Sequence, residues 1–250
     1  MTKKMVALVT GGVGGIGSAI CRELFQKGHQ VIAGYLPVIE EEAAQARLKE
    51  WRAEGADADI VSGDVGNFAS CAAMAKTIQQ KFGVVQVLVN CAGITKDKTF
   101  KKMMEEDWNT VLNVDLNSVF NVTKQFVDGM TEAGFGRIIN ISSVNGKKGQ
   151  FGQTNYSAAK AGMHGFTMAL AQEVVRKGVT VNTISPGYTE TLMTKAMPAE
   201  VTQQIVAQIP AGRMAQPEEI AYVVGFLADK RAGYITGVNI SSNGGLFISF

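Results

Sequence analysis

Short apolar runs alternate with longer amphipathic segments along most of the chain. The apolar runs are rich in β-branched residues and are bounded by glycine or polar residues, which is typical of buried strands. They cover residues 5–9, 31–34, 58–62, 85–89, 137–141, 179–184 and 238–241. The segments between them predict helices at residues 16–27, 40–53, 68–82, 105–130 (with room for a break), 156–174, 200–208 and 218–227.

This alternation predicts one α/β domain over residues 1–250. Parallel strands joined by right-handed crossovers form a Rossmann-type, doubly wound sheet of about seven strands with helices on both faces. A length of 250 residues is ample for one such core, and neither a repeat nor a linker divides the chain. Ligands of these sheets bind outside the carboxyl ends of the strands, so polar residues there are the first candidates for a site.

The composition excludes several kinds of partner. Hydrophobic residues make up 46% and charged residues 18% of the chain, as in a globular protein. The net charge of +2 argues against a nucleic acid partner, and no apolar stretch reaches membrane-spanning length. The three cysteines and two histidines lack metal-ligand spacing, so no metal site is expected. Widely separated cysteines suit a reducing compartment, and a cytoplasmic location is expected.

A glycine-rich segment, residues 10–17, follows the first expected strand and opens the first expected helix. Glycines allow a tight turn and a close approach to a pyrophosphate, and the helix offers free N–H groups and its positive dipole end. A tight turn without a ligand is the alternative interpretation. The position between strand and helix favours a dinucleotide site.

A second candidate site combines Ser142 and Ser143, at the end of the fifth expected strand, with Tyr156 and Lys160. The last two residues are four apart on an expected helix and therefore share a face. A nearby ammonium favours the phenolate and lowers the pKa of the tyrosine, which predicts a proton donor or acceptor that works near neutral pH. The alternative is a solvated helix face that carries Tyr156 and Lys160 by chance.

Four motifs occur together in the order of a known family. They are T-G-x-x-x-G-x-G at 10–17, N-x-A-G at 90–93, a serine thirteen residues before Y-x-x-x-K, and P-G after the sixth expected strand. The whole chain thereby resembles the short-chain dehydrogenase/reductase family. Residues 142–174 are most similar to the bacterial acetoacetyl-CoA reductases of polyhydroxybutyrate synthesis, with the 3-oxoacyl-[acyl-carrier-protein] reductases as the alternative. A non-catalytic dinucleotide sensor is the alternative of another class, although such sensors typically lose the serine, tyrosine and lysine.

The resemblance assigns roles to individual residues. Tyr156 would donate the proton to a ketone oxygen, Lys160 would lower its pKa and bind the nicotinamide ribose, and Ser143, rather than Ser142, would orient the carbonyl. The residues expected to bind the coenzyme, besides Tyr156 and Lys160, are Gly11, Gly12, Gly14, Gly15, Ile16, Gly17, Gly34, Tyr35, Asp64, Val65, Asn90, Ala92, Gly93, Pro186, Gly187 and Thr189.

One catalytic position departs from the family pattern. Alignment on L-x-S-V-F at residues 116–120 puts Asp115 where the family usually has an asparagine that supports a helix kink and a proton-relay water. Aspartate still accepts hydrogen bonds, but it brings a charge toward Lys160. Asp115 is therefore a fourth catalytic candidate, either as a member of the relay or with the relay carried in another way.

The coenzyme-selecting position also departs from the pattern. Reductases of this group commonly hold the 2′-phosphate of NADPH with a basic residue in the glycine turn or after the second strand. Here Gly14 and residues 35–37 stand at those places, three glutamates follow at 40–42, and Arg47 is the first cation. Such a site offers no cation to bind a dianionic phosphate and places carboxylates close to it. NADH is therefore expected as the preferred coenzyme, with NADPH as the alternative. The glutamates could also simply begin a helix.

The resemblance further implies a substrate and the residues that bind it. The expected reaction is reduction of acetoacetyl-CoA to (R)-3-hydroxybutyryl-CoA. Residues Gln150, Phe151, Gln153 and Tyr188 are assigned to the acyl and pantetheine part and Asp97 to the rim. Several lysines (Lys96, Lys98, Lys101, Lys102, Lys147, Lys148 and Lys195) either attract the phosphates of coenzyme A or form a solvated rim.

Two further features of the C-terminal third of the chain complete the expectations. Residues 192–197 are apolar and methionine-rich, and are expected to act as a flexible lid. Family members usually form tetramers, and Phe247, Ile248 and Phe250 fit burial against a neighbouring subunit, although docking on the same chain would also explain them. A homotetramer is therefore expected.

Overall fold

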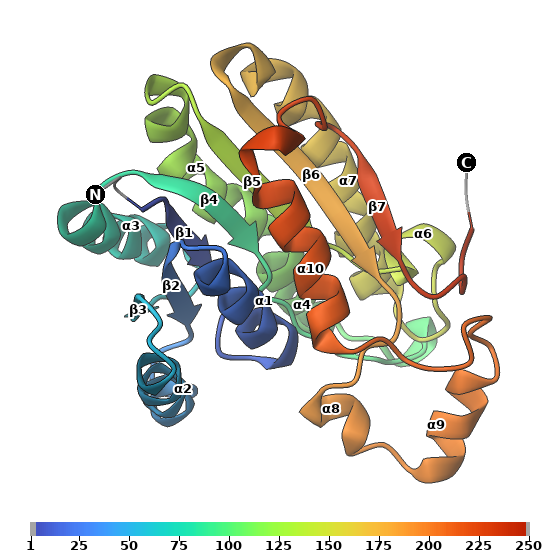
Figure 1. The fold of residues 1–250 in the computed structure, drawn as a ribbon. Helices are drawn as coiled ribbons and strands as arrows, with labels where there is room; N and C mark the ends of the chain where they lie inside the picture. The colour runs from blue at the N-terminus through green and yellow to red at the C-terminus, as the bar shows by residue number, and fades with distance from the viewer. Residues whose placement is uncertain (1–3, 249–250) are drawn as a thin grey trace.

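A parallel sheet of seven strands forms the centre of the protein (Figure 1). The computed structural model describes residues 4–248. The strand order is β3-β2-β1-β4-β5-β6-β7, and every neighbouring pair is parallel. The strands are β1 (Val6–Val9), β2 (Gln30–Tyr35), β3 (Ala58–Ser62), β4 (Val85–Asn90), β5 (Gly136–Ile141), β6 (Val179–Pro186) and β7 (Asn239–Ser242). The predicted doubly wound sheet is confirmed, with strand ends within two residues of the predicted ones.

The central strand β1 is apolar at every position because both faces of the sheet are covered there. Along β1, Val6 and Leu8 pack into one hydrophobic layer, whereas Ala7 and Val9 pack into the other. This two-residue alternation follows from the pleat of a strand. A strand with one wet face would have polar residues at every second position, and the continuous apolar runs of the sequence reflect their absence.

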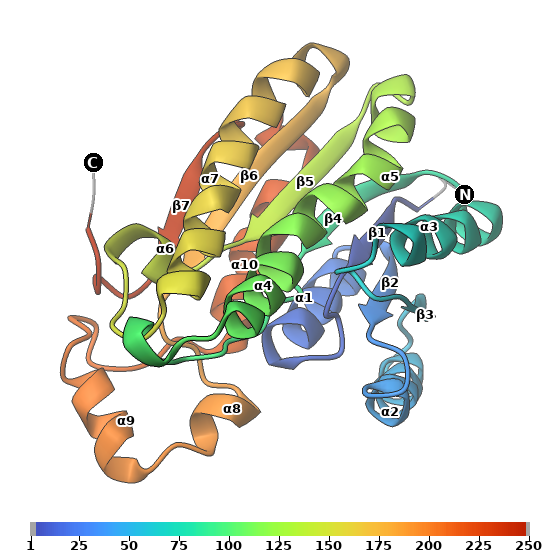
Figure 2. The ribbon, with the colours of Figure 1, turned by 180° about the vertical axis from the view of Figure 1, so that it is seen from behind.

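Helices cover the two faces in two layers. The layer in front in Figure 1 contains α1 (Gly15–Gln26), α2 (Glu41–Ala53) and α10 (Pro217–Ala228). The opposite layer, in front in Figure 2, contains α3 (Phe68–Phe82), α5 (Ser118–Glu132) and α7 (Thr154–Val174). Each helix buries an apolar stripe, such as Ile20 and Leu24 of α1, against the sheet. No helix in the described part of the chain is both long and apolar enough to span a membrane.

The long helix predicted at 105–130 is broken, as foreseen. It consists of α4 (Glu105–Leu112), the π-helical turn η2 (Asn113–Asn117) and α5. Within η2, Asn113 donates a hydrogen bond to the Gly66 carbonyl (3.0 Å), and Asp115 accepts one from the Ile94 N–H (2.8 Å). Both bonds reach outside the helix, so the turn is held by the loops at the carboxyl ends of β3 and β4.

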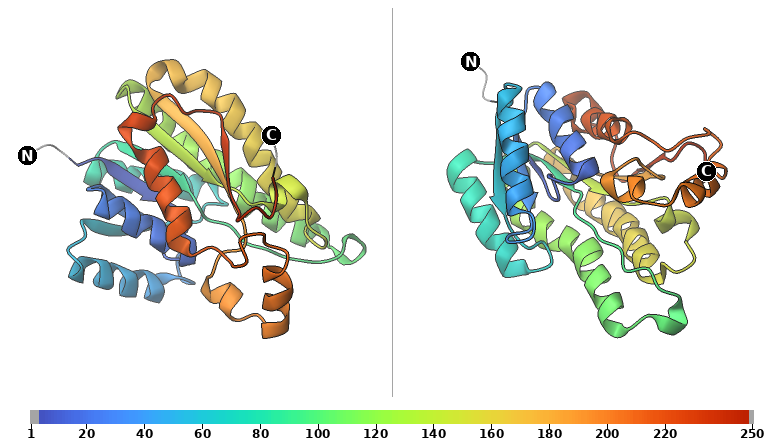
Figure 3. Two further views of the ribbon diagram at one scale, coloured as in Figure 1. Left: turned by 45° about the vertical axis from the view of Figure 1, so that its right-hand side comes forward. Right: turned by 90° about the horizontal axis from the view of Figure 1, so that it is seen from below.

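Several short elements were not predicted. They are the helices α6 (Asn145–Lys148) and α8 (Leu192–Lys195) and the 3₁₀ turns η1 (Phe100–Lys102), η3 (Val175–Lys177) and η4 (Lys230–Ala232). Segments of three or four residues carry too little periodicity to be recognised. Together with α9 (Ala199–Val206), α8 extends beyond the carboxyl ends of the strands (Figures 1 and 3). The segment expected to be a lid thus has a helical turn at its start.

A row of buried polar side chains crosses the sheet below its carboxyl edge. Asn90, Asn140 and Thr183 are neighbours in register on β4, β5 and β6. The Asn90 amide donates to the Asn140 side-chain oxygen (2.8 Å) and to the Thr123 hydroxyl (3.1 Å), while the Asn140 amide donates to the Thr167 hydroxyl (2.9 Å). Thr167 also contacts the Thr183 hydroxyl (2.7 Å). These hydrogen bonds tie α5, through Thr123, and α7, through Thr167, to the sheet.

Replacing Thr167 with valine is expected to lower the free energy of unfolding by about 2 kcal/mol, because it leaves the Asn140 amide and the Thr183 hydroxyl without this partner in a buried place. The matched control is Thr77→Val, which removes an exposed hydroxyl that bonds only within α3 and should cost no more than about 0.5 kcal/mol. Equilibrium urea denaturation of both variants measures the difference. Equal losses would show that the row contributes no special stability.

Candidate active site

A cleft of about 1340 Å³ opens at the carboxyl edge of the sheet. It is lined by residues that follow six of the strands, β1 to β6, as the convergence of parallel strands requires. Of the residues expected from the sequence, it brings together Gly11, Gly14, Gly15, Ile16, Gly17, Gly34, Tyr35, Asp64, Val65, Ala92, Gly93, Asp97, Ser143, Gln153, Tyr156, Lys160, Pro186, Gly187, Tyr188 and Thr189.

The glycine-rich turn after β1 has no room for a side chain at Gly11 or Gly17. Gly11 has a φ of +62°, and a Cβ atom on it would lie 2.9 Å from the Ala92 Cα atom. A Cβ atom on Gly17 would lie 2.1 Å from the Gly11 carbonyl oxygen. Gly14, at the N-cap of α1, provides no capping side chain, so the first N–H groups of the helix are left for a ligand. This cradle fits the pyrophosphate of a dinucleotide.

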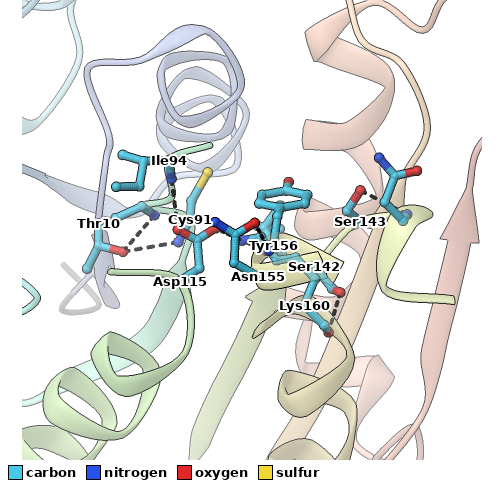
Figure 4. Close-up of polar contacts among 12 residues, drawn as sticks. Thr10, Cys91, Ile94, Asp115, Ser142, Ser143, Asn155, Tyr156 and Lys160 are labelled. Atoms are coloured by element: carbon cyan, nitrogen blue, oxygen red, sulfur yellow. Dashed lines mark hydrogen bonds and ion pairs between the residues drawn. The ribbon is translucent and has the colours of Figure 1, made fainter. Parts of the chain in front are cut away.

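Thr10, which sequence reasoning did not select, joins this turn to the next loop. Its hydroxyl oxygen accepts hydrogen bonds from the N–H groups of Cys91 (3.0 Å) and Ala92 (3.2 Å), as Figure 4 shows. The threonine thereby fixes the distance between the ends of β1 and β4, the central pair of strands. Its position directly before the first glycine was the available signal.

The serine, tyrosine and lysine lie side by side in the cleft (Figure 4). The Ser143 side chain lowers the pKa of the nearby Tyr156 phenol, and its oxygen accepts the N–H of Asn145 (3.1 Å). The Lys160 ammonium lies 5.5 Å from the centre of the Tyr156 ring. Ser142, in contrast, donates its hydroxyl to the Lys160 carbonyl (2.8 Å) and contacts His164. The geometry therefore favours Ser143 as the serine that is free to meet a substrate.

Lys160 is almost completely buried. Its ammonium group contacts the Ile141 carbonyl oxygen (3.1 Å) and the Asp115 carboxylate (3.1 Å). The other Asp115 oxygen accepts the Ile94 N–H (2.8 Å). Gly93 is wedged against this pair, because a Cβ atom there would lie 2.9 Å from Asp115 Oδ2 and 3.1 Å from Lys160 Nζ. The unusual aspartate is thus a direct partner of Lys160.

The pKa of the Tyr156 phenol is raised rather than lowered, contrary to the sequence-based prediction. Burial has the largest effect and raises this pKa, Lys160 lowers it, and the negative charge of Asp115 raises it. For Lys160, burial lowers the pKa, but Asp115 and Tyr156 together raise it above its ordinary value. The prediction counted only the ammonium, whereas burial of the phenol and the negative charge of Asp115 both act in the opposite direction.

Three predicted coenzyme or catalytic positions lie outside the cleft lining. The side chain of Asn90 points into the polar row below the sheet edge instead of toward a ribose. Gly12 faces β2, where its Cβ atom would lie 2.7 Å from the Ala33 Cβ atom. Asp115 lies behind Lys160 and Gly93. All three residues therefore lie behind the residues that line the cleft.

The predicted substrate residues fall into two groups. Asp97 and Gln153 are joined by a hydrogen bond of 2.7 Å inside the cleft, and the Asn145 amide donates to Gln153 (2.9 Å). Gln150 and Phe151 do not line the cleft: Gln150 accepts a hydrogen bond from Lys148 (2.8 Å), and Phe151 is 86% exposed. Both residues lie on the loop between α6 and α7, outside the cleft lining.

Carboxylates surround the loop after β2. The Leu36 N–H donates to the Glu40 carboxylate (2.6 Å), and the Tyr35 hydroxyl donates to Glu41 (2.6 Å). Leu36 and Glu40 both line the cleft. Arg47, the first cation after the strand, is paired with Glu50 (2.8 Å). Among the residues that the structure describes, Lys160 is the only cationic side chain in the cleft lining.

A parallel doubly wound sheet, a glycine cradle at a helix N-terminus and a Ser–Tyr–Lys set at one sheet edge define a dinucleotide-dependent oxidoreductase. The family model described as short chain dehydrogenase matches residues 5–202, and the chain belongs to this family. Its members use NAD(H) or NADP(H), which fits the cradle described above.

Named relatives match nearly the whole chain. An acetoacetyl-CoA reductase of Allochromatium vinosum is 59% identical over 97% of this chain and 98% of its own length. One from Cupriavidus necator is 51% identical over 98% and 99%. A 3-oxoacyl-[acyl-carrier-protein] reductase of Pseudomonas aeruginosa is 46% identical over 98% of both chains. The crystal structure of gox2181 has a TM-score of 0.93 at 32% identity and covers 98% of this chain and 96% of that one.

Proposed function

We propose that the protein is an acetoacetyl-CoA reductase that forms (R)-3-hydroxybutyryl-CoA for polyhydroxybutyrate synthesis. The observation that carries this proposal is the meeting of Ser143, Tyr156 and Lys160 in one cleft beside a dinucleotide cradle. The more similar of the named relatives above act on acetoacetyl-CoA. Reduction of 3-oxoacyl groups on a carrier protein is the second candidate, supported by the relative at 46% identity.

The roles of the side chains follow from their positions. A bound reduced nicotinamide supplies the hydride. The Ser143 hydroxyl donates a hydrogen bond to the substrate's keto oxygen and holds it beside the phenol. Tyr156 donates its proton to that oxygen as negative charge develops there. The Lys160 ammonium, 5.5 Å from the ring centre, stabilises the phenolate that remains.

The mouth of the cleft offers contacts for a thioester. Asp97, Gln153 and Asn145 form a hydrogen-bonded chain on one wall, and Tyr188 lines the same cleft. The exposed ring of Phe151 and the amide of Gln150 lie on the loop outside it, where a pantetheine arm would pass. Rim lysines add positive charge, but Lys98 is paired with Asp107 (2.7 Å) and Lys148 with Gln150. Lys101 and Lys102, both exposed on η1, are the better candidates for the phosphates of coenzyme A.

The purified enzyme is expected to reduce acetoacetyl-CoA with a higher kcat/KM than acetoacetyl-carrier protein. Tyr156→Phe should lower kcat by about 10²–10⁴-fold because it removes the proton donor. Tyr222→Phe, which alters an exposed ring outside the cleft, is the control and should keep full activity. Initial rates with both substrates measure these effects. Preference for the carrier-protein substrate would favour the second candidate, and unchanged turnover by Tyr156→Phe would reject the mechanism.

We propose NADH as the preferred coenzyme. Glu40 and Leu36 line the adenosine end of the cleft, and Arg47 is already paired with Glu50. A 2′-phosphate there would meet the Glu40 carboxylate without a nearby cation to balance it. A 2′-hydroxyl, in contrast, is neutral and can donate a hydrogen bond.

Glu40→Gln is expected to raise kcat/KM for NADPH by about tenfold, because it removes a repulsive charge close to the phosphate. The glutamine can still accept the Leu36 N–H that Glu40 accepts at 2.6 Å, so the loop should stay in place and activity with NADH should change little. Glu42→Gln, an exposed neighbour outside the cleft lining, is the matched control. The proposal fails if wild-type enzyme prefers NADPH, or if both variants respond alike.

We also propose that the enzyme works in the cytoplasm as a homotetramer. Phe68 and Phe120 stack at 6.0 Å between ring centres and are about half exposed, as is Met168. Ile248 is 76% exposed, while Phe250 lies outside the described residues. Such apolar surfaces on α3, α5, α7 and the C-terminal segment fit burial between subunits. Light scattering should give a mass of about four chains, and a monomer would refute this assembly.

A further inference from the structure

Asp115 is an ionisable residue buried in the centre of the site. Its side chain has no exposed surface, and that of Lys160 is 4% exposed. Oδ2 of Asp115 lies 3.1 Å from Lys160 Nζ, while Oδ1 accepts the N–H of Ile94 at 2.8 Å. Figure 4 shows this carboxylate between the loop after β4 and the helix that carries Tyr156 and Lys160.

The charge of Asp115 is not needed to hold the π-helical turn. The bond from Ile94 needs only an oxygen acceptor, and an asparagine side chain supplies one of the same size and shape. What the carboxylate adds is a negative charge at Oδ2, where Lys160 is its only ion-pair partner among residues 4–248. An unpaired carboxylate in this place would be costly, so its charge is tied to that of the lysine.

The charged and titratable groups around the phenol come from several elements. Lys160 is on α7, Asp115 is in η2, and Asp97 is in the loop after β4, while the uncharged Ser143 hydroxyl follows β5. Cys91, at the end of β4, faces Lys160. Lys160 alone would favour the phenolate, whereas the two aspartates oppose it. Asp115 is the aspartate paired with the lysine, so its charge offsets part of the effect of the ammonium on the phenol.

We propose that Asp115 is a positioning residue that holds the Lys160 ammonium by an ion pair and, through its negative charge, keeps Tyr156 protonated to higher pH than a neutral residue at 115 would. The consequence is an enzyme set for reduction. The phenol stays in the acid form that donates a proton, and ketone reduction continues into the alkaline range. This inference rests on the proposed role of Tyr156 as proton donor and deepens it.

Asp115→Asn tests the proposal with two readouts. Titration of the free enzyme by phenolate absorbance, with Tyr156→Phe made in each background to identify the Tyr156 signal, should show its pKa lowered by about one pH unit. The alkaline limit of the reductase pH–rate profile should move down by the same amount, since loss of the phenol proton ends reduction. In the reverse, alcohol-oxidising direction, activity should appear at lower pH.

Asp107→Asn is the matched control. Asp107 is also a buried aspartate paired with a lysine, at 2.7 Å from Lys98, but it lies outside the cleft lining, so neither readout should move. An unchanged or raised Tyr156 pKa in Asp115→Asn would overturn the proposal. The absorbance titration needs no substrate. It therefore tests the effect of Asp115 on the Tyr156 pKa even if acetoacetyl-CoA is not turned over. If Asp115→Asn does not fold, Asp115→Ser, which is smaller and also neutral, should give the same downward shift.

Discussion

A lysine ammonium removed from water must find its hydrogen bonds and charge compensation inside the protein. For Lys160 these come from the Ile141 carbonyl at the end of β5 and from Asp115 in the π-helical turn. Each contact joins two elements at the site: the end of β5 to α7, and the π-helical turn to α7. Gly93 follows from the same constraint, because any side chain there would occupy the space of the ion pair. The catalytic geometry is therefore a consequence of how one buried charge is satisfied.

The alternation of apolar and amphipathic segments was sufficient to predict the sheet and its main helices. In β1 every residue faces one of two covered layers, so local composition and tertiary environment agree. The π-helical turn could be foreseen only as a break, since its cause is a contact between Asp115 and a loop 21 residues away in sequence. Short helices such as α6 and α8 depend on the strand ends they follow rather than on their own periodicity.

The sequence was sufficient to predict which side chains meet in the candidate site, but not how their charges affect one another. Helical spacing put Tyr156 and Lys160 on one face, the family resemblance added Ser143, and all three line the cleft. The direction of the Tyr156 pKa shift was wrong because burial and Asp115 act through space and leave no pattern in the sequence. The direction of the Asn90 side chain could not be predicted for a related reason. Its motif suggests a ribose contact, whereas strand register pairs it with Asn140 in the sheet interior.

The cleft binds an anionic coenzyme with little help from cationic side chains. Asp64, Asp97 and Glu40 line it, while Lys160, its only cation among the described residues, is already paired with Asp115. The attraction for a pyrophosphate must then come from backbone N–H groups and the N-terminal end of α1, which stabilise a compact anion at one place only. A further phosphate several ångströms away, beside Glu40, gains nothing from that source. Nearby carboxylates thus bear both on the proposed coenzyme preference, through Glu40, and on the pKa of the Tyr156 phenol, through Asp115.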